Sequence, residues 1–383
     1  MRSVVVAKFV PWPPNSGDKR RTLGLVRALR QRGEVTLCAF EGPDDDAGPL
    51  RAEGIEVRSV PLQRSAASLL QGALLGRSIT AARFWSRRLA AEVAVATAEP
   101  TDVVLVGHAQ FLPYLRGVRA GLSVVDMQNV ESALAQRISA SSRGPRRWAW
   151  WGEARALRAL ERRTRVADVV SVVSDVDRAT LAGIIAHPRV LVVPNAWDEP
   201  EPLPPAPDPV VSFVALLSWG PNVDAAVWFA REVWPRVVAE VPEARLQLVG
   251  RNPAEAVQAL AGPTVEVTGT VPDLAPWYAR TRVAVAPLLA GGGSRLKILE
   301  ALAAARPVVA TTIGAEGLED LIGRGVVVAD DPAEMASALV GLLVDAEGTA
   351  ALGRIGVDAV AADHSWTAAV RPLLAAIPGT APE

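Results

Sequence analysis

The sequence predicts an α/β protein made of two parallel-sheet domains. Three observations support this fold class. Short apolar runs alternate with helical stretches in both halves of the chain, which is typical of parallel strands covered by helices on both faces. The two alternating series are separated by residues 199–209 (EPEPLPPAPDP), where six of eleven residues are prolines. The length of 383 residues also suits two domains that each bury a core.

The first series begins with a strand at 3–10, followed by a loop at 11–18 (PWPPNSGD) and a helix that continues to about Arg32. Further strands are predicted at 35–40, 55–60, 103–106, 122–127, 169–173 and 190–193. We therefore expect a first domain over residues 1–194 and a semi-rigid linker over 195–209.

The second series begins at Val210 (VVSFVALL), and it predicts a second domain over residues 210–364. Its further strands are predicted at 245–249, 264–268, 283–287, 308–311 and 326–328. A final helical segment, within 365–383, is expected to pack back on the first domain. Ligands of parallel sheets bind at the carboxyl ends of the strands, so the loops there should line a cleft between the domains. These loops are 11–18, 218–222, 288–294 and 312–317.

Charge and composition exclude several classes of protein. The net charge of −1 provides no global field for nucleic acid. The single cysteine, Cys38, excludes an internal disulfide and fits a reducing compartment. No apolar run approaches the ~18 residues of a membrane-spanning helix, and residues 4–7 are too short for a signal-peptide core. We expect a cytoplasmic protein whose contact with a membrane, where there is one, is peripheral and on the inner face.

The most informative segment is 291–300 (GGGSRLKILE), a glycine-rich turn between a strand and a helix. Ser294 is expected to cap the helix and to place Arg295 and Lys297 in its first turn. Free N–H groups and the helix dipole already make this end positive, so two cations there indicate a bound anion such as a phosphate. Glu300, on the same helical face as Lys297, should face sugar hydroxyls instead of the phosphate.

An ordinary helix cap with a Lys297–Glu300 surface ion pair is the alternative interpretation of this segment. Composition favours the phosphate site. Only Lys8, Lys19 and Lys297 are lysines among 40 basic residues. Lys19 and Lys297 both follow predicted strands in glycine-containing loops, where a compact point charge suits phosphate better than the fork of an arginine.

Several stretches of the second half resemble the GT-B glycosyltransferases of group 1 (family 4), a retaining class. They occur in family order: VPNAWD at 193–198, SWGPNVDAAVWF at 218–229, LQLVGRNP at 246–253, VEVTGTVPDLAPWY at 265–278, APLLAGGGSRLKILEALAAARPVVAT at 286–311 and GAEGL at 314–318. The first half resembles the family more weakly, through PPNSGDKRR at 13–21 and DMQNVES at 126–132.

The resemblance implies a GT-B fold, with two Rossmann-like parallel-sheet domains facing a central cleft. It implies a UDP- or GDP-sugar donor held mainly by the second domain. The sugar would pass with retained configuration to a glycan, lipid-linked or small-molecule acceptor, as in polysaccharide biosynthesis. It implies no obligatory metal and no other cofactor.

Carried over by position, Arg295 and Lys297 resemble the family's diphosphate-binding pair and are predicted to be catalytic. The reason is that fixed cations should stabilise the charge that builds on the leaving phosphate. Glu300 resembles the second glutamate of the E-x7-E motif, which holds the ribose. The first glutamate would fall at Gly292, so backbone N–H groups of Gly292 and Gly293 are expected to contact the donor sugar instead. The other predicted donor-binding residues are Gly17, Gly220, Arg251 and Ser294.

Candidates in the first half lie after its predicted strands. His108 is a catalytic candidate because family members often place a histidine there, and a polar loop residue is the alternative. Lys19, Asn129 and Glu131 are predicted on the acceptor side. Glu131 could instead be a charge at a helix N-terminus, and Gly17 a simple helix start. Asp44–Asp46 (DDD) is interpreted as a solvated turn and not as a metal site.

Residues 143–165 hold eight arginines, two glutamates and three tryptophans, Trp148, Trp150 and Trp151. A basic, tryptophan-bearing helix predicts peripheral membrane contact. The alternative is a long packed helix whose tryptophans enter the core.

Two function classes remain open at this point. The first is a glycosyltransferase. The second is a GT-B protein without transfer activity, such as a sugar-nucleotide epimerase or a catalytically silent binding protein, because the first glutamate of the motif is missing. An epimerase would need acid–base carboxylates and histidines at the site, and the chain has 3 histidines.

Overall fold

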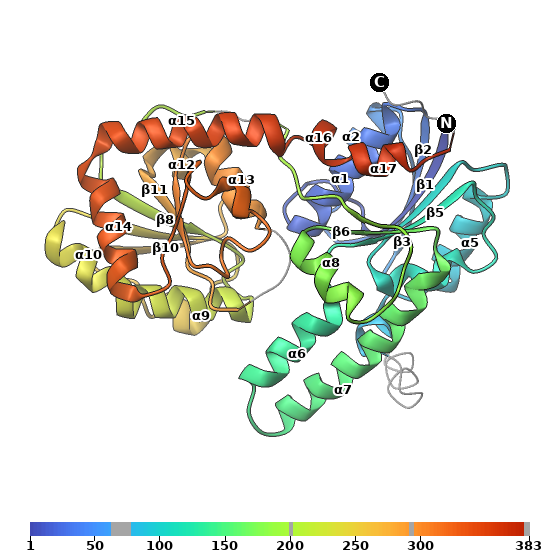
Figure 1. Ribbon diagram of the computed structural model, residues 1–383, viewed down its shortest axis with the longest axis horizontal. Coiled ribbons are helices and arrows are strands. Elements are labelled where there is room, and N and C mark those ends of the chain that lie inside the picture. Colours follow the sequence, from blue (N-terminus) through green and yellow to red (C-terminus); the bar gives the residue numbers. More distant parts are fainter. Residues whose placement is uncertain (63–77, 199–201, 291–294, 379–383) are drawn as a thin grey trace. The chain divides into compact units, whose positions relative to one another are not determined.

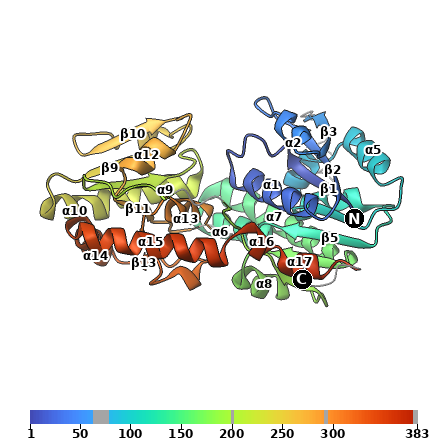
Figure 2. The ribbon, with the colours of Figure 1, turned by 90° about the horizontal axis from the view of Figure 1, so that it is seen from above.

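The chain divides between Pro194 and Asn195 into two units, each built on its own parallel sheet (Figures 1 and 2). Unit 1 comprises Met1–Pro194 and Ala369–Glu383, and unit 2 comprises Asn195–Ala368. The structure is a computed structural model that describes residues 1–62, 78–198, 202–290 and 295–378.

Unit 1 has a seven-stranded sheet in the order β3-β2-β1-β4-β5-β6-β7, with every pairing parallel. Its strands are β1 (Arg2–Phe9), β2 (Glu34–Glu41), β3 (Glu56–Pro61), β4 (Val103–Gly107), β5 (Leu122–Met127), β6 (Val169–Val172) and β7 (Val190–Val192). Its helices are α1 (Gly17–Arg30), α2 (Gly48–Ala52), α4 (Ile79–Arg83), α5 (Arg87–Ala96), η1 (Ala109–Leu115), α6 (Glu131–Ser141), α7 (Gly144–Glu161), η2 (Arg162–Val166), α8 (Asp175–Ala182) and α17 (Arg371–Ala375).

Unit 2 has a six-stranded parallel sheet in the order β10-β9-β8-β11-β12-β13. Its strands are β8 (Val210–Val214), β9 (Arg245–Val249), β10 (Val265–Gly269), β11 (Val283–Ala286), β12 (Val308–Ala310) and β13 (Val326–Val328). Its helices are α9 (Gly220–Trp228), η3 (Phe229–Val233), α10 (Trp234–Glu240), α11 (Glu255–Gln258), α12 (Ala275–Arg280), α13 (Leu296–Ala303), η4 (Glu319–Leu321), α14 (Pro332–Val344) and α15 (Ala346–Asp363), while α16 (Trp366–Ala369) crosses the boundary between the units.

Continuously apolar strands form these sheets because both of their faces are buried. In β4 (VVLVG) every residue is buried, and helix α5 packs Leu89 and Val93 into the same cluster. Unit 2 has two such clusters, one formed with α9, α10 and α14 and the other with α12, α13 and α15. Figure 1 shows α9 and α10 along one side of that sheet and α12, α13 and α15 along the other. The predicted α/β class with two parallel sheets is confirmed, and each predicted strand is present within one or two residues.

The described part of the proline-rich stretch is held against unit 2 by two arginines. Arg306 donates from Nη2 to the carbonyl oxygen of Pro204 at 2.6 Å. Arg282 donates to the carbonyl oxygens of Ala206 and Pro207. Residues 202–209 are therefore part of unit 2, and the break between the units lies earlier, after Pro194.

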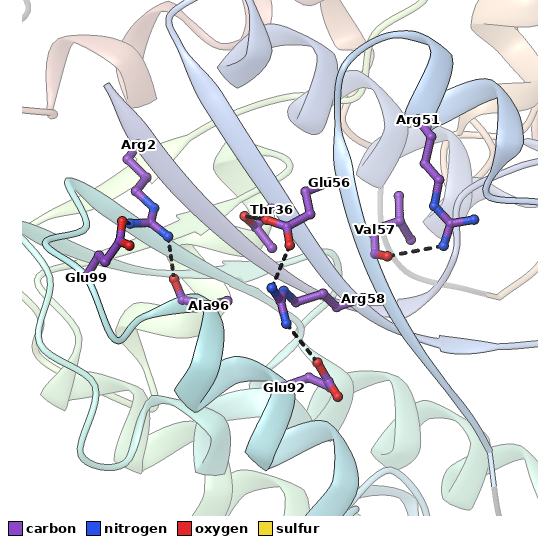
Figure 3. A network of polar contacts seen from close by, with 9 residues as sticks. All are labelled: Arg2, Thr36, Arg51, Glu56, Val57, Arg58, Glu92, Ala96 and Glu99. Atoms are coloured by element: carbon purple, nitrogen blue, oxygen red, sulfur yellow. Dashed lines mark hydrogen bonds and ion pairs between the residues drawn. The ribbon is translucent and has the colours of Figure 1, made fainter.

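A surface network fastens the edge strand β3 to α5 (Figure 3). Arg58 on β3 lies 2.7 Å from Glu56 of its own strand and 3.2 Å from Glu92 on α5. Glu56 also accepts a hydrogen bond of 2.9 Å from Thr36 on β2. These contacts join the edge strand to β2 and to α5.

Both sheets reverse their strand order at one place. In unit 1 the reversal separates β1 from β4, and in unit 2 it separates β8 from β11. Consecutive connections run to opposite sides at such a point, which leaves a crevice beyond the carboxyl ends of the two central strands. The loops that follow β1, β4, β8 and β11 are therefore where each unit is expected to hold a ligand.

Candidate active site

Helix α13 begins at the carboxyl end of β11, beside the reversal point of unit 2. The helix starts at Leu296, and Arg295 is its N-cap residue with φ −92° and ψ 87°. The prediction that Arg295 lies inside the first turn is therefore wrong, whereas Lys297 does lie there. Gly292, Gly293 and Ser294 fall outside the described residues, so their predicted donor contacts stay predictions.

The non-helical backbone of Arg295 lets its side chain reach the loop after β12. Its Nη2 donates to the carbonyl oxygen of Ile313 at 3.2 Å and lies 3.7 Å from Glu316. That loop packs directly on β11, because a Cβ at Gly314 would lie 2.0 Å from the carbonyl oxygen of Ala286. The buried guanidinium is thus fixed in place by residues of the predicted 312–317 loop.

Lys297 points to the other side of the reversal point. Its Nζ donates to Oδ1 of Asn222 at 3.0 Å and lies 4.7 Å from the centre of the Phe213 ring. The amide of Asn222 in turn donates from Nδ2 to the carbonyl oxygen of Leu216 at 3.0 Å. These two hydrogen bonds join α13, α9 and the loop after β8. Asn222 itself is buried, at 8% exposure. Sequence analysis did not select Asn222, although it lies within the SWGPNVDA segment.

The charge of Lys297 is poorly compensated. Burial and, to a smaller extent, the charge of the neighbouring Arg295 lower the pKa of Lys297, Glu300 acts in the opposite direction, and the resulting pKa is about 7. The dipole of α13 adds another positive contribution. An anion bound at this helix end would remove the conflict. Glu300 lies within α13, is partly buried, and is three residues beyond Lys297.

The loops after β8 and β9, which carry Gly220 and Arg251, lie against each other. A Cβ at Gly250 would lie 1.7 Å from the carbonyl oxygen of Ala215, so only glycine permits this approach of the two loops. The N–H of Leu217 donates to the carbonyl oxygen of Arg251 at 3.2 Å. Gly220 is exposed at the start of α9.

Four large apolar side chains are exposed around this edge of unit 2. They follow β8, β11 and β12, and their exposed fractions are 42% for Leu216, 41% for Trp219, 42% for Leu289 and 37% for Ile313. An apolar rim beside cationic and hydrogen-bonding groups suits a ligand that has both ring faces and phosphates. Trp219 was missed at the sequence level, where the only signal was a tryptophan in a loop after a strand.

In unit 1 the reversal point carries His108, directly after β4. Its φ of 68° is unusual for a residue other than glycine, and the residue is 8% exposed. Neither ring nitrogen has a hydrogen-bond partner among the described residues, although Nδ1 lies 3.5 Å from Oε1 of Glu131. A buried, strained histidine with two unused ring nitrogens fits a binding role better than a polar loop residue.

The other predicted unit 1 residues surround the starts of two helices. Gly17 is the exposed first residue of α1, and Glu131 is the first residue of α6. Burial raises the pKa of Asp18, but the charge of Lys8 at 3.3 Å, a hydrogen bond from Ser16 and the nearby His108 bring that pKa below its usual value. Asn129 is partly buried in the turn between β5 and α6.

Lys19 has a structural partner that the sequence did not indicate. Its Nζ lies 2.5 Å from Oδ1 of Asp45, and both side chains are buried. Asp45 also accepts a hydrogen bond of 2.9 Å from the N–H of Gly42. The interpretation of Asp44–Asp46 as a solvated turn therefore holds for Asp44 and Asp46 but is wrong for Asp45, because the carboxylate of Asp45 neutralises Lys19.

Metal ligands and membrane spans were sought within the described ranges. There, no group of three or more His, Cys, Asp or Glu side chains is placed to hold a metal ion. No single helix of those ranges is long and apolar enough to span a membrane, and only the bent pair of α14 and α15 meets that test jointly.

Comparisons with known proteins agree with this geometry. Residues 208–345 match the family model described as "Glycosyl transferases group 1". A Klebsiella pneumoniae protein called "Uncharacterized 44.6 kDa protein in cps region" is 28% identical over 130 residues. That alignment covers 32% of this chain and 34% of the relative, so the match spans about a third of the curated protein.

Three solved structures have the same fold over nearly the whole chain. Sucrose-phosphate synthase from Thermosynechococcus elongatus gives a TM-score of 0.69 at 18% identity, covering 97% of both chains. TarM gives 0.73 at 10% identity, covering 99% of both chains. Anabaena Alr3699/HepE in complex with UDP gives 0.65 at 15% identity, covering 97% of this chain and 98% of that one. HepE was also solved with UDP-glucose.

Proposed function

From a chain with the GT-B fold and a group 1 glycosyltransferase domain, we propose a retaining transfer of sugar from a nucleotide-diphosphate-sugar to a hydroxyl acceptor. One observation carries the proposal. Lys297 and Arg295 lie at the N-terminal end of α13, beside the reversal point of the sheet, and an anion bound there would compensate the buried charge of Lys297, whose pKa is lowered mainly by burial.

The donor is proposed to be a UDP- or GDP-sugar. Its diphosphate contacts Arg295 and Lys297. Its ribose hydroxyls donate hydrogen bonds to the carboxylate of Glu300. Gly220 and Arg251 follow β8 and β9 at the carboxyl edge of the same sheet. The family resemblance adds Gly292, Gly293 and Ser294 to the proposed donor-binding residues. The UDP and UDP-glucose in the HepE structures support a UDP-sugar as the first donor to test.

The chemistry needs few side chains. The bond between the anomeric carbon and the β-phosphate oxygen breaks, and a bond to the acceptor oxygen forms on the same face of the sugar. The acceptor proton passes to the leaving phosphate. Two fixed cations opposite the developing phosphate charge supply the main stabilisation, because they need no reorganisation during the step. No metal ion or cofactor is part of this proposal.

His108 is proposed to contact the donor sugar through a ring nitrogen, with Gly17 beside it and Glu131 orienting the ring. Asn129 and Glu131 are proposed on the acceptor side. Lys19 is a weaker acceptor residue than its sequence position indicated, because Asp45 already neutralises it. A glycan or lipid-linked acceptor, as in polysaccharide assembly on the inner face of a membrane, belongs to the same proposal.

A sugar-nucleotide epimerase is the second candidate. The observation that favours it is the grouping of Asp18, His108 and Glu131 in unit 1, which offers acid–base groups. Donor turnover separates the two functions. UDP- and GDP-sugars are incubated with and without a mixture of glycan and lipid-linked acceptors, and both nucleotide release and sugar identity are measured. Nucleotide release that requires an acceptor supports transfer, and a new sugar-nucleotide without acceptor supports epimerisation instead.

A further inference from the structure

Helices α6 and α7 form an antiparallel hairpin that projects from the sheet of unit 1 (Figure 1). The hairpin has its own small apolar cluster of Ala135, Ala154 and Leu157, with Trp150 packed against it. Glu153 fixes the hairpin to α4 by accepting hydrogen bonds from the hydroxyl of Ser78 and the N–H of Thr80. Its shape is thus set by internal contacts and does not need a partner.

Two of the three tryptophans on α7 are left in solvent. Trp148 is 67% exposed and Trp151 is 50% exposed, and their rings meet edge to face at 6.2 Å. The guanidinium of Arg155 lies 4.9 Å from the ring of Trp151. The alternative that these tryptophans enter the core holds for Trp150 alone. Adjacent exposed indoles indicate a surface that becomes covered by something else.

The charges of the hairpin are sorted between its inner and outer sides. Its three carboxylates turn inward: Glu131 lies near His108, Glu153 holds α4, and the buried Glu161 accepts hydrogen bonds from Ser132. The exposed charged residues of the hairpin and of the following η2 are all arginines, at 137, 143, 146, 147, 155, 162, 163 and 165. A protein with a net charge of −1 therefore presents one strongly cationic face.

We propose that this face, which we call the Arg–Trp face (Arg143, Arg147, Trp148, Trp151 and Arg155), docks on the surface of an anionic phospholipid bilayer. Guanidinium groups match lipid phosphates, and indoles prefer the boundary between headgroups and acyl chains. A nucleic acid would satisfy the arginines equally well, but it gives no apolar layer for two adjacent indoles. The bilayer therefore accounts for both halves of the pattern.

The test is co-sedimentation of the full chain with vesicles of phosphatidylglycerol and phosphatidylcholine, without donor or acceptor. Wild type should bind anionic vesicles and lose binding at high salt or on pure phosphatidylcholine. Trp148→Ala with Trp151→Ala, and separately Arg143→Glu with Arg147→Glu, should each weaken binding by about tenfold or more. Matched controls are Trp85→Ala, at 49% exposure, and Arg231→Glu with Arg354→Glu on the exposed surface of unit 2. These controls should bind within roughly twofold of wild type.

Three outcomes would overturn the proposal: no binding of wild type at low salt, wild-type binding by the tryptophan double variant, or equal losses in the controls. Binding of duplex DNA or RNA that depends on the arginines but not on the tryptophans would identify a general polyanion surface instead. Folding of each variant is checked by circular dichroism. The link to a lipid-linked acceptor rests on the proposed function, whereas vesicle binding is measured without transfer, so each can fail alone.

Discussion

The Nζ of Lys297 donates a 3.0 Å hydrogen bond to Oδ1 of Asn222, across 75 residues of sequence. The contact joins the helix that follows β11 to the helix that follows β8, the two strands at the reversal point of unit 2. Asn222 is a neutral acceptor, so it positions the ammonium without cancelling its charge. The charge then remains available for a diphosphate.

Asn222 should therefore act as a positioning residue. Asn222→Asp would place a carboxylate next to Lys297, which should preserve or raise the melting temperature while repelling a diphosphate. Nucleoside diphosphate affinity should fall about tenfold or more. Calorimetric titration with UDP and GDP checks this result. Asp224→Asn, on the same helix, is the matched control for a changed charge. Unchanged affinity in Asn222→Asp would contradict a positioning role of Asn222.

Donor binding should be linked to proton uptake. Near pH 7.5 a Lys297 with a pKa of about 7 is largely neutral, and a bound diphosphate would raise that pKa and draw a proton from the buffer. Titrations in buffers of different ionisation enthalpy measure the uptake directly. At pH 7.5 the uptake should reach about three-quarters of a proton per site in wild type and vanish in Lys297→Met. Equal uptake in both proteins would assign the proton to another group.

Stability should also depend on pH through Lys297. The pKa of this lysine is about 7 in the folded chain and 10.5 in an ordinary lysine, so the unfolded chain binds more protons between these values. The free energy of unfolding contributed by this residue should therefore rise as the pH increases from about 7 toward 10. Chemical denaturation across this range, compared with Lys297→Met, isolates the contribution. A variant curve with the same slope as wild type would contradict it.

Glu300 should distinguish ribose from deoxyribose. Wild type is expected to bind UDP more tightly than 2′-deoxy-UDP, because hydrogen bonds to a carboxylate are worth on the order of 1.5–3 kcal/mol. Glu300→Gln should weaken UDP by about tenfold and bring the two ligands to similar affinity. Calorimetry with both nucleotides gives the comparison, and a preference that survives the substitution would place the ribose elsewhere.

His108 should lower the free energy of unfolding of the protein, yet it should be needed for turnover. His108→Gly removes the side chain and accepts the positive φ without strain, which should raise the free energy of unfolding by about 1 kcal/mol. Turnover should fall about 10²-fold if the ring contacts the donor sugar. Both quantities are measured on one preparation. Loss of stability with normal turnover would make His108 a structural residue.

The strands could be predicted from sequence because both faces of a covered parallel sheet require apolar side chains, as VVVA in β1 and VVLV in β4 show. Lys297 was found because a lysine in the first turn of a helix conflicts with its dipole. Asn222 and the Lys19–Asp45 pair were not found, since neither depends on a local pattern. They depend on which loops the strand order brings together, 75 and 26 residues apart. Which indoles of α7 face solvent was set by packing against α6, and periodicity alone left it open.

Lys297→Met tests the central claim most directly, with melting temperature measured without ligand and turnover measured on the same preparation. Methionine keeps the length of the side chain and removes a poorly compensated buried charge. The account predicts that the variant melts no lower than wild type while transfer falls by about 10²–10³-fold. A structural role for Lys297 predicts the reverse, and a variant that is less stable but still active would contradict the diphosphate site.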